Sequence, residues 1–211
     1  SAIVDALDDR FSVHSGGRRR ALERHGTMRA TIDWSYRLLT ADEQRLFQWL
    51  AVFSNGAELD AVQHIATAMG LDESAGTEVL ASLVTKSMVF AEQLPTGTRY
   101  RLLETMRAYA LEQLDDRNDR LAAAVAHANW VTTLTDLPTA FPGSAEVERN
   151  SIRLEREADN WRDAVMLAAR LRSGDLAGRL CGPPVAYFLL GRSDLADFVK
   201  PLLELTETDW R

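Results

Sequence analysis

Apolar residues recur every three or four positions through much of the chain, which is the spacing that places them on one face of a helix. Thr27 can cap a first helix, and Thr40 with Glu43 three residues later forms a capping-box pattern for a second. We therefore predict helices that start near residues 27 and 41. The apolar positions assigned to these two helices are Met28, Ile32, Trp34, Leu38, Leu46, Phe47, Leu50 and Phe53.

The pattern continues with two more helices and then changes. Helical spacing extends through 59–69 and again through about 75–87, where Val79, Leu80, Leu83 and Val84 are expected to point inward. The following segments, 87–92 and 99–103, read as extended strands around a turn at 95–98. A further helix is expected from Glu104 to Leu114. Three short helices, a β-hairpin and another helix make up the element order of a winged-helix domain, with residues 95–98 as the tip of the wing.

Beyond residue 116 the pattern is helical throughout. One stripe is expected to hold Leu121, Val125, Ala128 and Leu134, and a linker is expected at 138–143, where prolines cluster. A second stripe, stepping by four, three, four and three, predicts one face of a single helix. Its members are Leu154, Ala158, Trp161, Val165 and Ala168.

Glycines then separate two further helices of the length found in tetratricopeptide (TPR) repeats. The first of these contains Pro183-Pro184, which must kink or break it because proline lacks a backbone donor. Paired helices of this kind stack, since one repeat cannot bury its apolar face alone, so we expect the array to continue past this chain. The fold class predicted is mainly α, with a winged helix and one hairpin followed by TPR-like helical hairpins. The domains predicted are 1–26, the end of a preceding region and a loop, then 27–116, the winged helix, and 117–211, the helical region.

Charge and cysteine content narrow the function classes. The net charge of −7 argues against binding of a phosphate backbone by the whole chain. Residues 1–37 carry seven arginines against five acids, so any polyanion contact should involve that segment. The single cysteine, Cys181, reads as a small packing residue, and its use fits a reducing compartment such as the cytoplasm. No apolar run is long enough to cross a bilayer, so no membrane partner is expected, and the Ser1-Ala2 start looks like the edge of an excised piece.

No catalytic or metal-binding pattern emerges. A phosphate-binding P-loop needs glycines before Lys and Ser or Thr, and no glycine stands directly before Lys86-Ser87. The four histidines lack metal-ligand spacing, and one cysteine cannot build a thiolate zinc site. We expect no catalytic residue, no metal and no cofactor in this chain. A nucleotide-binding enzyme would need a glycine-rich loop outside the given residues.

The alternative function is DNA binding. Many winged helices place their third helix in the major groove of DNA. That helix, about Ala75 to Ser87, offers a single cation, Lys86, and no Arg, Asn or Gln for contacts to base edges. The wing tip is neutral, with Arg99 and Arg101 behind it. The residue content therefore favours protein contact over DNA readout.

Three motifs carry a resemblance to a known family. They are RHGTMRATIDWSYRLL at 24–39, YRLLETMRAYA at 100–110 and EADNWRDA at 157–164. In this order they resemble segments of bacterial signal-transduction ATPases of the NB-ARC (STAND) class, which include AfsR-like and LuxR-type transcriptional regulators. The resemblance implies a switch in which an upstream domain holds ADP or ATP, the winged helix folds over it and the helical repeats sense a signal.

The resemblance also implies contact residues. His25, Arg29, Trp34 and Tyr36 are candidates for contacts with the upstream ATPase domain, while helix periodicity expects Trp34 in the core and Arg29 at the surface. The family's nucleotide-contacting Met-His-Asp motif falls on Leu102, Leu103 and Glu104. Leucine cannot donate a hydrogen bond to phosphate, so packing is the role expected at Leu103, and Glu104 is expected to begin a helix.

The function predicted is that of a non-catalytic regulatory fragment that makes interdomain and protein-protein contacts and gates a nucleotide switch. Its expected partners are its own upstream ATPase domain, its downstream repeats and a signalling protein or ligand. DNA would be bound through a different domain of the parent protein. The alternative is a winged-helix DNA-binding domain of a transcription factor.

Overall fold

The computed structural model describes residues 28–95, 97–136 and 144–182, together with residues 185, 200 and 202. The predicted cap at Thr27, the candidate His25, the linker at 138–143 and the Pro183-Pro184 kink lie outside these residues. A helix at 28–37 comes first. The elements that follow are α2 (Ala41–Leu50), α3 (Leu59–Ala68), α4 (Glu73–Thr85), β1 (Phe90–Leu94), β2 (Gly97–Arg101), α5 (Glu104–Asp116), α6 (Arg120–Thr135), α7 (Ala145–Arg156), α8 (Ala158–Leu171) and α9 (Gly174–Leu180).

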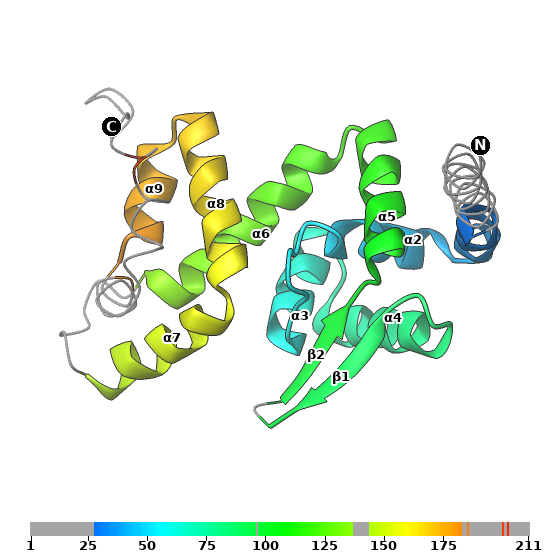
Figure 1. The fold of residues 1–211 in the computed structure, drawn as a ribbon, viewed down its shortest axis with the longest axis horizontal. Coiled ribbons are helices and arrows are strands. Elements are labelled where there is room, and N and C mark those ends of the chain that lie inside the picture. Colours follow the sequence, from blue (N-terminus) through cyan, green and yellow to red (C-terminus); the bar gives the residue numbers. More distant parts are fainter. Residues whose placement is uncertain are drawn as a thin grey trace, which may run out of the picture.

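The predicted fold class is confirmed: the chain is mainly helical, with one two-stranded antiparallel hairpin (Figure 1). Helix α2 begins where the capping box placed it. The Thr40 hydroxyl accepts a hydrogen bond from the Glu43 amide, and the Glu43 carboxylate accepts one from the Thr40 amide. Helix α4 begins two residues earlier than predicted, because Asp72 caps it by accepting from the Ala75 amide at 2.8 Å.

The wing starts later than the sequence pattern suggested. Ser87 adopts a left-handed conformation (φ 57°), and the amides of Met88 and Val89 both bond to the Leu83 carbonyl. These bonds close the C-terminus of α4, so the first strand begins only at Phe90. The register pairs Phe90 with Arg101 at the open end of the hairpin.

The loop after α2 packs closely against the wing through backbone hydrogen bonds. Ala57 and Tyr100 exchange hydrogen bonds of 2.9 and 2.8 Å, which adds an isolated bridge to the edge of β2. Gly56 before it has φ +73°, and a Cβ there would lie 2.5 Å from the Tyr100 carbonyl oxygen. Glycine is required at this position for both reasons.

Helix α6 belongs to both halves of the molecule. It packs on α3 of the winged helix and on α7, α8 and α9 of the helical region, and Figure 1 shows it running from one half to the other. Its side chains His127 and Trp130 pack edge-on against Phe53, with ring centroids 4.7 and 5.5 Å away. The buried apolar residues accordingly form one continuous cluster across both halves. The predicted stripe on α6 is wrong at Leu121, which is 54% exposed.

The single helix predicted through 154–168 is also wrong, because the chain breaks at Glu157 into α7 and α8. Four members of the apolar stripe are buried as predicted, Leu154, Trp161, Val165 and Ala168, and Ala158 is half-buried. Glu157 leaves helical geometry (φ −97°, ψ 16°), and its side chain is fully buried. Cys181, expected to pack, is exposed just after α9.

Candidate functional site

A groove of about 330 Å³ lies between the helix at 28–37 and α5. It brings together two of the sequence-predicted residues, Arg29 and Glu104. Arg29 is exposed, as predicted, and its guanidinium lies 2.6 Å from the Glu112 carboxylate. This hydrogen bond lowers the pKa of Glu112. Ile32 and Tyr109 are buried beneath the groove, so its floor is apolar and its rim is charged.

The other two candidates on this helix face opposite ways. Tyr36 is 5% exposed; its hydroxyl accepts a hydrogen bond from Gln48, and its ring lies 5.4 Å from that of Tyr109. Tyr36 is therefore a core residue and is unavailable to a partner in this conformation. Trp34 is 65% exposed and Leu38, one turn later, is 61% exposed. The prediction that Trp34 lies in the core is wrong, because the buried face runs through Ile32 and Tyr36, and Trp34 lies across the helix from it.

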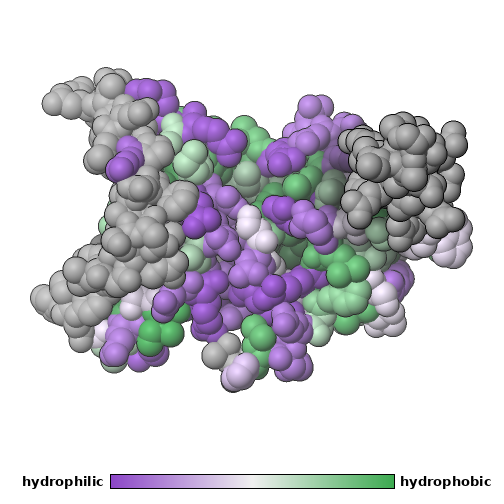
Figure 2. Space-filling view, in the orientation of Figure 1, coloured by the Kyte–Doolittle hydropathy of each residue, from purple (hydrophilic) through white to green (hydrophobic). Residues whose placement is uncertain are grey.

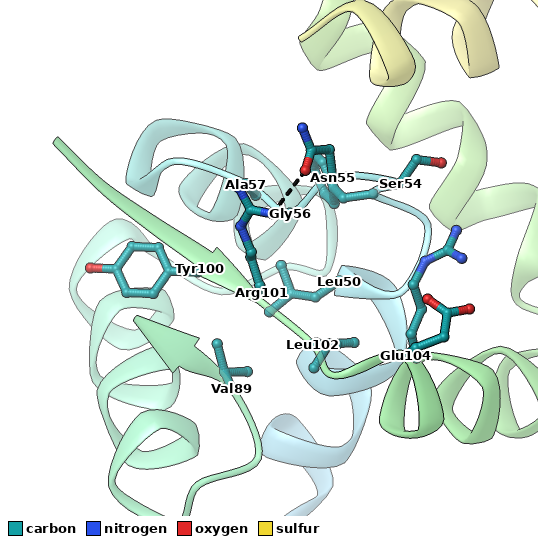
Figure 3. A pocket seen from close by; sticks show the side chains of 12 residues that line it. Leu50, Ser54, Asn55, Gly56, Ala57, Val89, Tyr100, Arg101, Leu102 and Glu104 are labelled. Carbon is teal, nitrogen blue, oxygen red and sulfur yellow. Dashed lines mark hydrogen bonds between the residues drawn. The ribbon is translucent and has the colours of Figure 1, made fainter. Parts of the chain in front are cut away.

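Leu103 and Glu104 sit at the start of α5. Leu103 is the N-cap residue without a side-chain cap bond, and it is 49% exposed, so the expected packing role is wrong. Glu104 begins α5 as predicted, where a carboxylate interacts favourably with the helix dipole. It also lines a second pocket of about 180 Å³ beside the Arg101 to Asn55 hydrogen bond (Figure 3). Leu103 therefore lies at the surface, and Glu104 lines both the groove and this second pocket.

Helix α4 is the element that would read DNA in a winged helix. Its one nearby cation, Lys86, is bonded to Glu43 at 2.5 Å, and Ser82 donates to the same carboxylate oxygen. The Glu43 carboxylate is 6% exposed; although desolvation opposes it, hydrogen bonds from Lys86, Ser82 and Thr40 lower its pKa to about 2. Since α4 also exposes Glu73 and Glu78, its outward surface has no surplus of positive charge.

The two arginines of the wing also pair with carboxylates of the chain itself. Arg101 lies 2.8 Å from Glu92 on the paired strand and donates to the Asn55 side chain. Arg99 is 3% exposed and donates through two nitrogens to Glu157, at 2.7 and 2.8 Å. Neither guanidinium extends from the wing tip toward a phosphate backbone.

Arg99 and Glu157 form the centre of a buried polar network that joins the wing to the α7 and α8 junction. Arg99 also donates to the carbonyls of Asn55 and Gly56, at 2.6 and 3.0 Å. Asn160 donates to Glu157 at 2.7 Å and accepts from the Ser54 amide at 3.0 Å. No pattern along the chain indicates this network, because its members are up to 106 positions apart.

Ion pairs outline the same junction at the surface. Arg153 on α7 bonds to Asp60, and Arg156 lies 3.4 Å from Glu58. Hydrophilic side chains gather across the middle of the molecule in Figure 2. The two halves are therefore joined by charged as well as apolar contacts.

Residues 28–95, 97–136 and 144–182 hold no group of three or more His, Cys, Asp or Glu side chains placed to bind a metal. In the same part of the chain, no helix combines the length and apolar character needed to cross a membrane.

Comparison with known proteins identifies the first half of the molecule. Residues 39–115 match a family model described as a winged helix-turn-helix domain, in agreement with the fold. Over 163 residues the chain is 44% identical to "Putative HTH-type transcriptional regulator Rv0890c" of Mycobacterium tuberculosis and to Mb0914c of Mycobacterium bovis, which carries the same description. These matches cover 77% of this chain and 18% of each relative.

A second relative is "Uncharacterized protein Rv0894" of M. tuberculosis, 36% identical over 120 residues that cover 56% of this chain and 30% of the relative. No solved structure matches the chain significantly. The chain is thus homologous to proteins described as transcriptional regulators, and it spans about a fifth of the length of the first of them. These findings favour the predicted alternative, a transcription-factor domain, more than the ATPase-gated fragment.

Proposed function

We propose that this chain is the winged-helix and helical part of a transcriptional regulator, and that its winged helix contacts other protein segments instead of duplex DNA. The first part is supported by the homology to HTH-type regulators. The second is supported by one observation above all: Trp34 on the helix at 28–37 and Leu38 directly after it are 65% and 61% exposed, while the opposite face of the helix is buried. Large apolar side chains exposed together mark sites of protein contact.

The charge distribution supports the same proposal. A DNA-reading surface needs unpaired cations for phosphates and polar side chains for base edges. Here Lys86, Arg99 and Arg101 each pair with a carboxylate of the chain itself. Opening those pairs would cost free energy before any phosphate contact could form.

The occupant of the Trp34 and Leu38 surface is proposed to be another domain of the same regulator. Much of each relative's length lies outside the matched region, so such a domain is available there. By the family resemblance this would be an ATPase domain holding ADP or ATP. In that case the charged groove that holds Arg29 and Glu104 would lie beside the contact.

The test compares exposure of Trp34 in two polypeptides. Hydroxyl-radical footprinting of the 211-residue chain should show rapid oxidation at Trp34. In a longer polypeptide that carries the native flanking sequence, Trp34 should be protected, whereas the buried Trp130 and Trp161 stay protected in both. Equal oxidation of Trp34 in the two polypeptides would reject the interdomain contact.

DNA binding by the winged helix is the second candidate, and the names of the relatives favour it. Selection from a randomised duplex library decides between the two. If the winged helix contacts only protein, no sequence motif should be enriched by the 211-residue chain at about 150 mM salt. Enrichment of a motif, with binding lost in a Lys86→Glu variant, would establish DNA recognition and overturn the protein-contact proposal.

A further inference from the structure

A pocket of about 210 Å³ opens where the two halves of the molecule meet, and arginines from three helices line it. Arg107 comes from α5 of the winged helix, Arg120 from α6 and Arg170 from α8. The 52–54 segment after α2 closes another side through Val52 and Ser54. Three guanidinium groups from separate elements converge here in a chain whose net charge is −7.

Two buried nitrogen atoms among the residues that line this pocket have no hydrogen-bond partner in the described part of the chain. One is Nε of Arg107 and the other is Nε2 of His127, whose side chain is 3% exposed. Buried polar atoms in folded proteins nearly always have a partner, and each exception calls for an explanation. A guanidinium nitrogen can only donate, so the Arg107 atom requires an acceptor.

The charges around the pocket favour an anionic acceptor. Asp163 is the one acidic residue among those that line it, and its carboxylate already accepts a hydrogen bond from the Ser54 hydroxyl. The Arg120 guanidinium also forms an ion pair with the Asp115 carboxylate, at 2.9 Å. Arg107 also lines the adjoining pocket of Figure 3, where Arg101 and Glu104 contribute one charge of each sign. Positive charge therefore exceeds negative charge on the pocket walls.

We propose that this pocket binds a phosphate-type oxyanion, either free phosphate or the phosphoryl group of a larger molecule. Arginine donors from several directions match the tetrahedral oxygens of such a group, and hydrogen bonds between charged groups are the strong ones. The volume is below the roughly 300 to 1,000 Å³ of pockets that hold drug-sized ligands, which suits a small ion or a single group. Bound there, the oxyanion would accept hydrogen bonds from the arginines that line the pocket.

Such an anion would connect the winged helix to the helical region. Arg107 belongs to the first, Arg170 to the second, and Arg120 begins the helix that both share. Binding would thus strengthen the contact between the two halves, whatever the winged helix itself recognises. The site is independent of whether that target is protein or DNA.

The experiment is a titration of the 211-residue chain with inorganic phosphate, followed by NMR of the arginine and histidine side chains. Sodium chloride at equal ionic strength is the control for screening. Saturable shifts of the Arg107 and His127 signals are expected with phosphate only. Arg107→Gln and Arg170→Gln should each weaken binding about tenfold or more, the loss typical of one charged hydrogen bond.

Arg149→Gln is the matched control, because Arg149 is exposed on α7 away from the pocket and its loss changes the net charge equally. Arg170 is exposed, so its variant keeps the test valid if Arg107→Gln unfolds the chain. Titration with phosphoserine separates the sources: tighter binding than phosphate points to a phosphorylated molecule, and equal binding points to the free ion. Shifts reproduced by chloride, or lost equally in Arg149→Gln, would overturn the proposal.

Discussion

On the side of the winged helix that meets α7 and α8, Arg99 is buried, donates to Glu157 through two nitrogens, and also donates to the carbonyls of Asn55 and Gly56. On the side formed by the helix at 28–37, Trp34 stands 65% exposed. The cation is inside and the indole is outside, which reverses the usual placement of these residue types. The inner side stabilises the junction between the two halves, whereas the outer side is where we propose a contact with another domain.

The strongest test of this comparison removes the buried cation. Arg99→Met should lower the free energy of unfolding by about 3 to 5 kcal/mol, because it leaves the Glu157 charge buried without its partner. Urea denaturation measures the effect. Arg101→Met, at a residue 40% exposed, should cost about 1 kcal/mol or less. Similar losses in both variants would remove the distinction between the two arginines.

The next largest effect concerns pH. Burial lowers the pKa of His127 to about 4, so the unfolded chain binds the proton more tightly than the folded one. The contribution of neutral His127 to the free energy of unfolding is fully present above about pH 6.5 and is lost progressively as the pH falls toward 4. The whole contribution is about 3 kcal/mol. A His127→Phe variant should show a flatter dependence of unfolding free energy on pH in that window. Parallel curves for the two proteins would contradict the assignment.

A smaller effect is expected at the start of α2. Glu43→Gln removes the charge that holds Lys86 and weakens the capping box with Thr40, and we expect a loss of about 1 to 2 kcal/mol. Because folding lowers the pKa of Glu43 to about 2, this contribution is present above about pH 4.5 and lost as the pH falls toward 2. Thermal unfolding at pH 7 and pH 3 should show a smaller difference between variant and parent at the lower pH.

The smallest effect belongs to the outer side. Trp34→Ser in the 211-residue chain should change the unfolding free energy by less than about 0.5 kcal/mol, because the side chain is mostly in water already. Chemical denaturation of variant and parent under identical conditions measures this. A loss of about 2 kcal/mol would mean that Trp34 serves the core after all.

Local signals in the sequence were enough for much of the fold. The capping box at Thr40 located the start of α2, and the change from helical to extended spacing located the wing. Trp34 was predicted in the core, although it is two positions after Ile32 and therefore lies across the helix from it. Positions 32, 36 and 39 define the buried stripe, and Trp34 lies outside it.

The junction could not be predicted in the same way. The break at Glu157 lies inside an unbroken apolar stripe, so periodicity continues across it. At the break, Glu157 bonds to Arg99, which is 58 residues away, and no local rule connects the two. The pocket lined by Arg107, Arg120 and Arg170 depends likewise on how three distant helices meet. The boundaries predicted at residues 26 and 116 stay predictions.

Helix α6 has a practical consequence for anyone who isolates the winged helix-turn-helix domain. The matched region ends at residue 115, but the aromatic ring of Phe53 is covered by Trp130 and His127 from beyond that point. Truncation after α5 would leave this ring in water and favour aggregation of the product. In the intact chain the two halves should melt in one cooperative transition, with amide protons of α3 and α6 exchanging at similar rates.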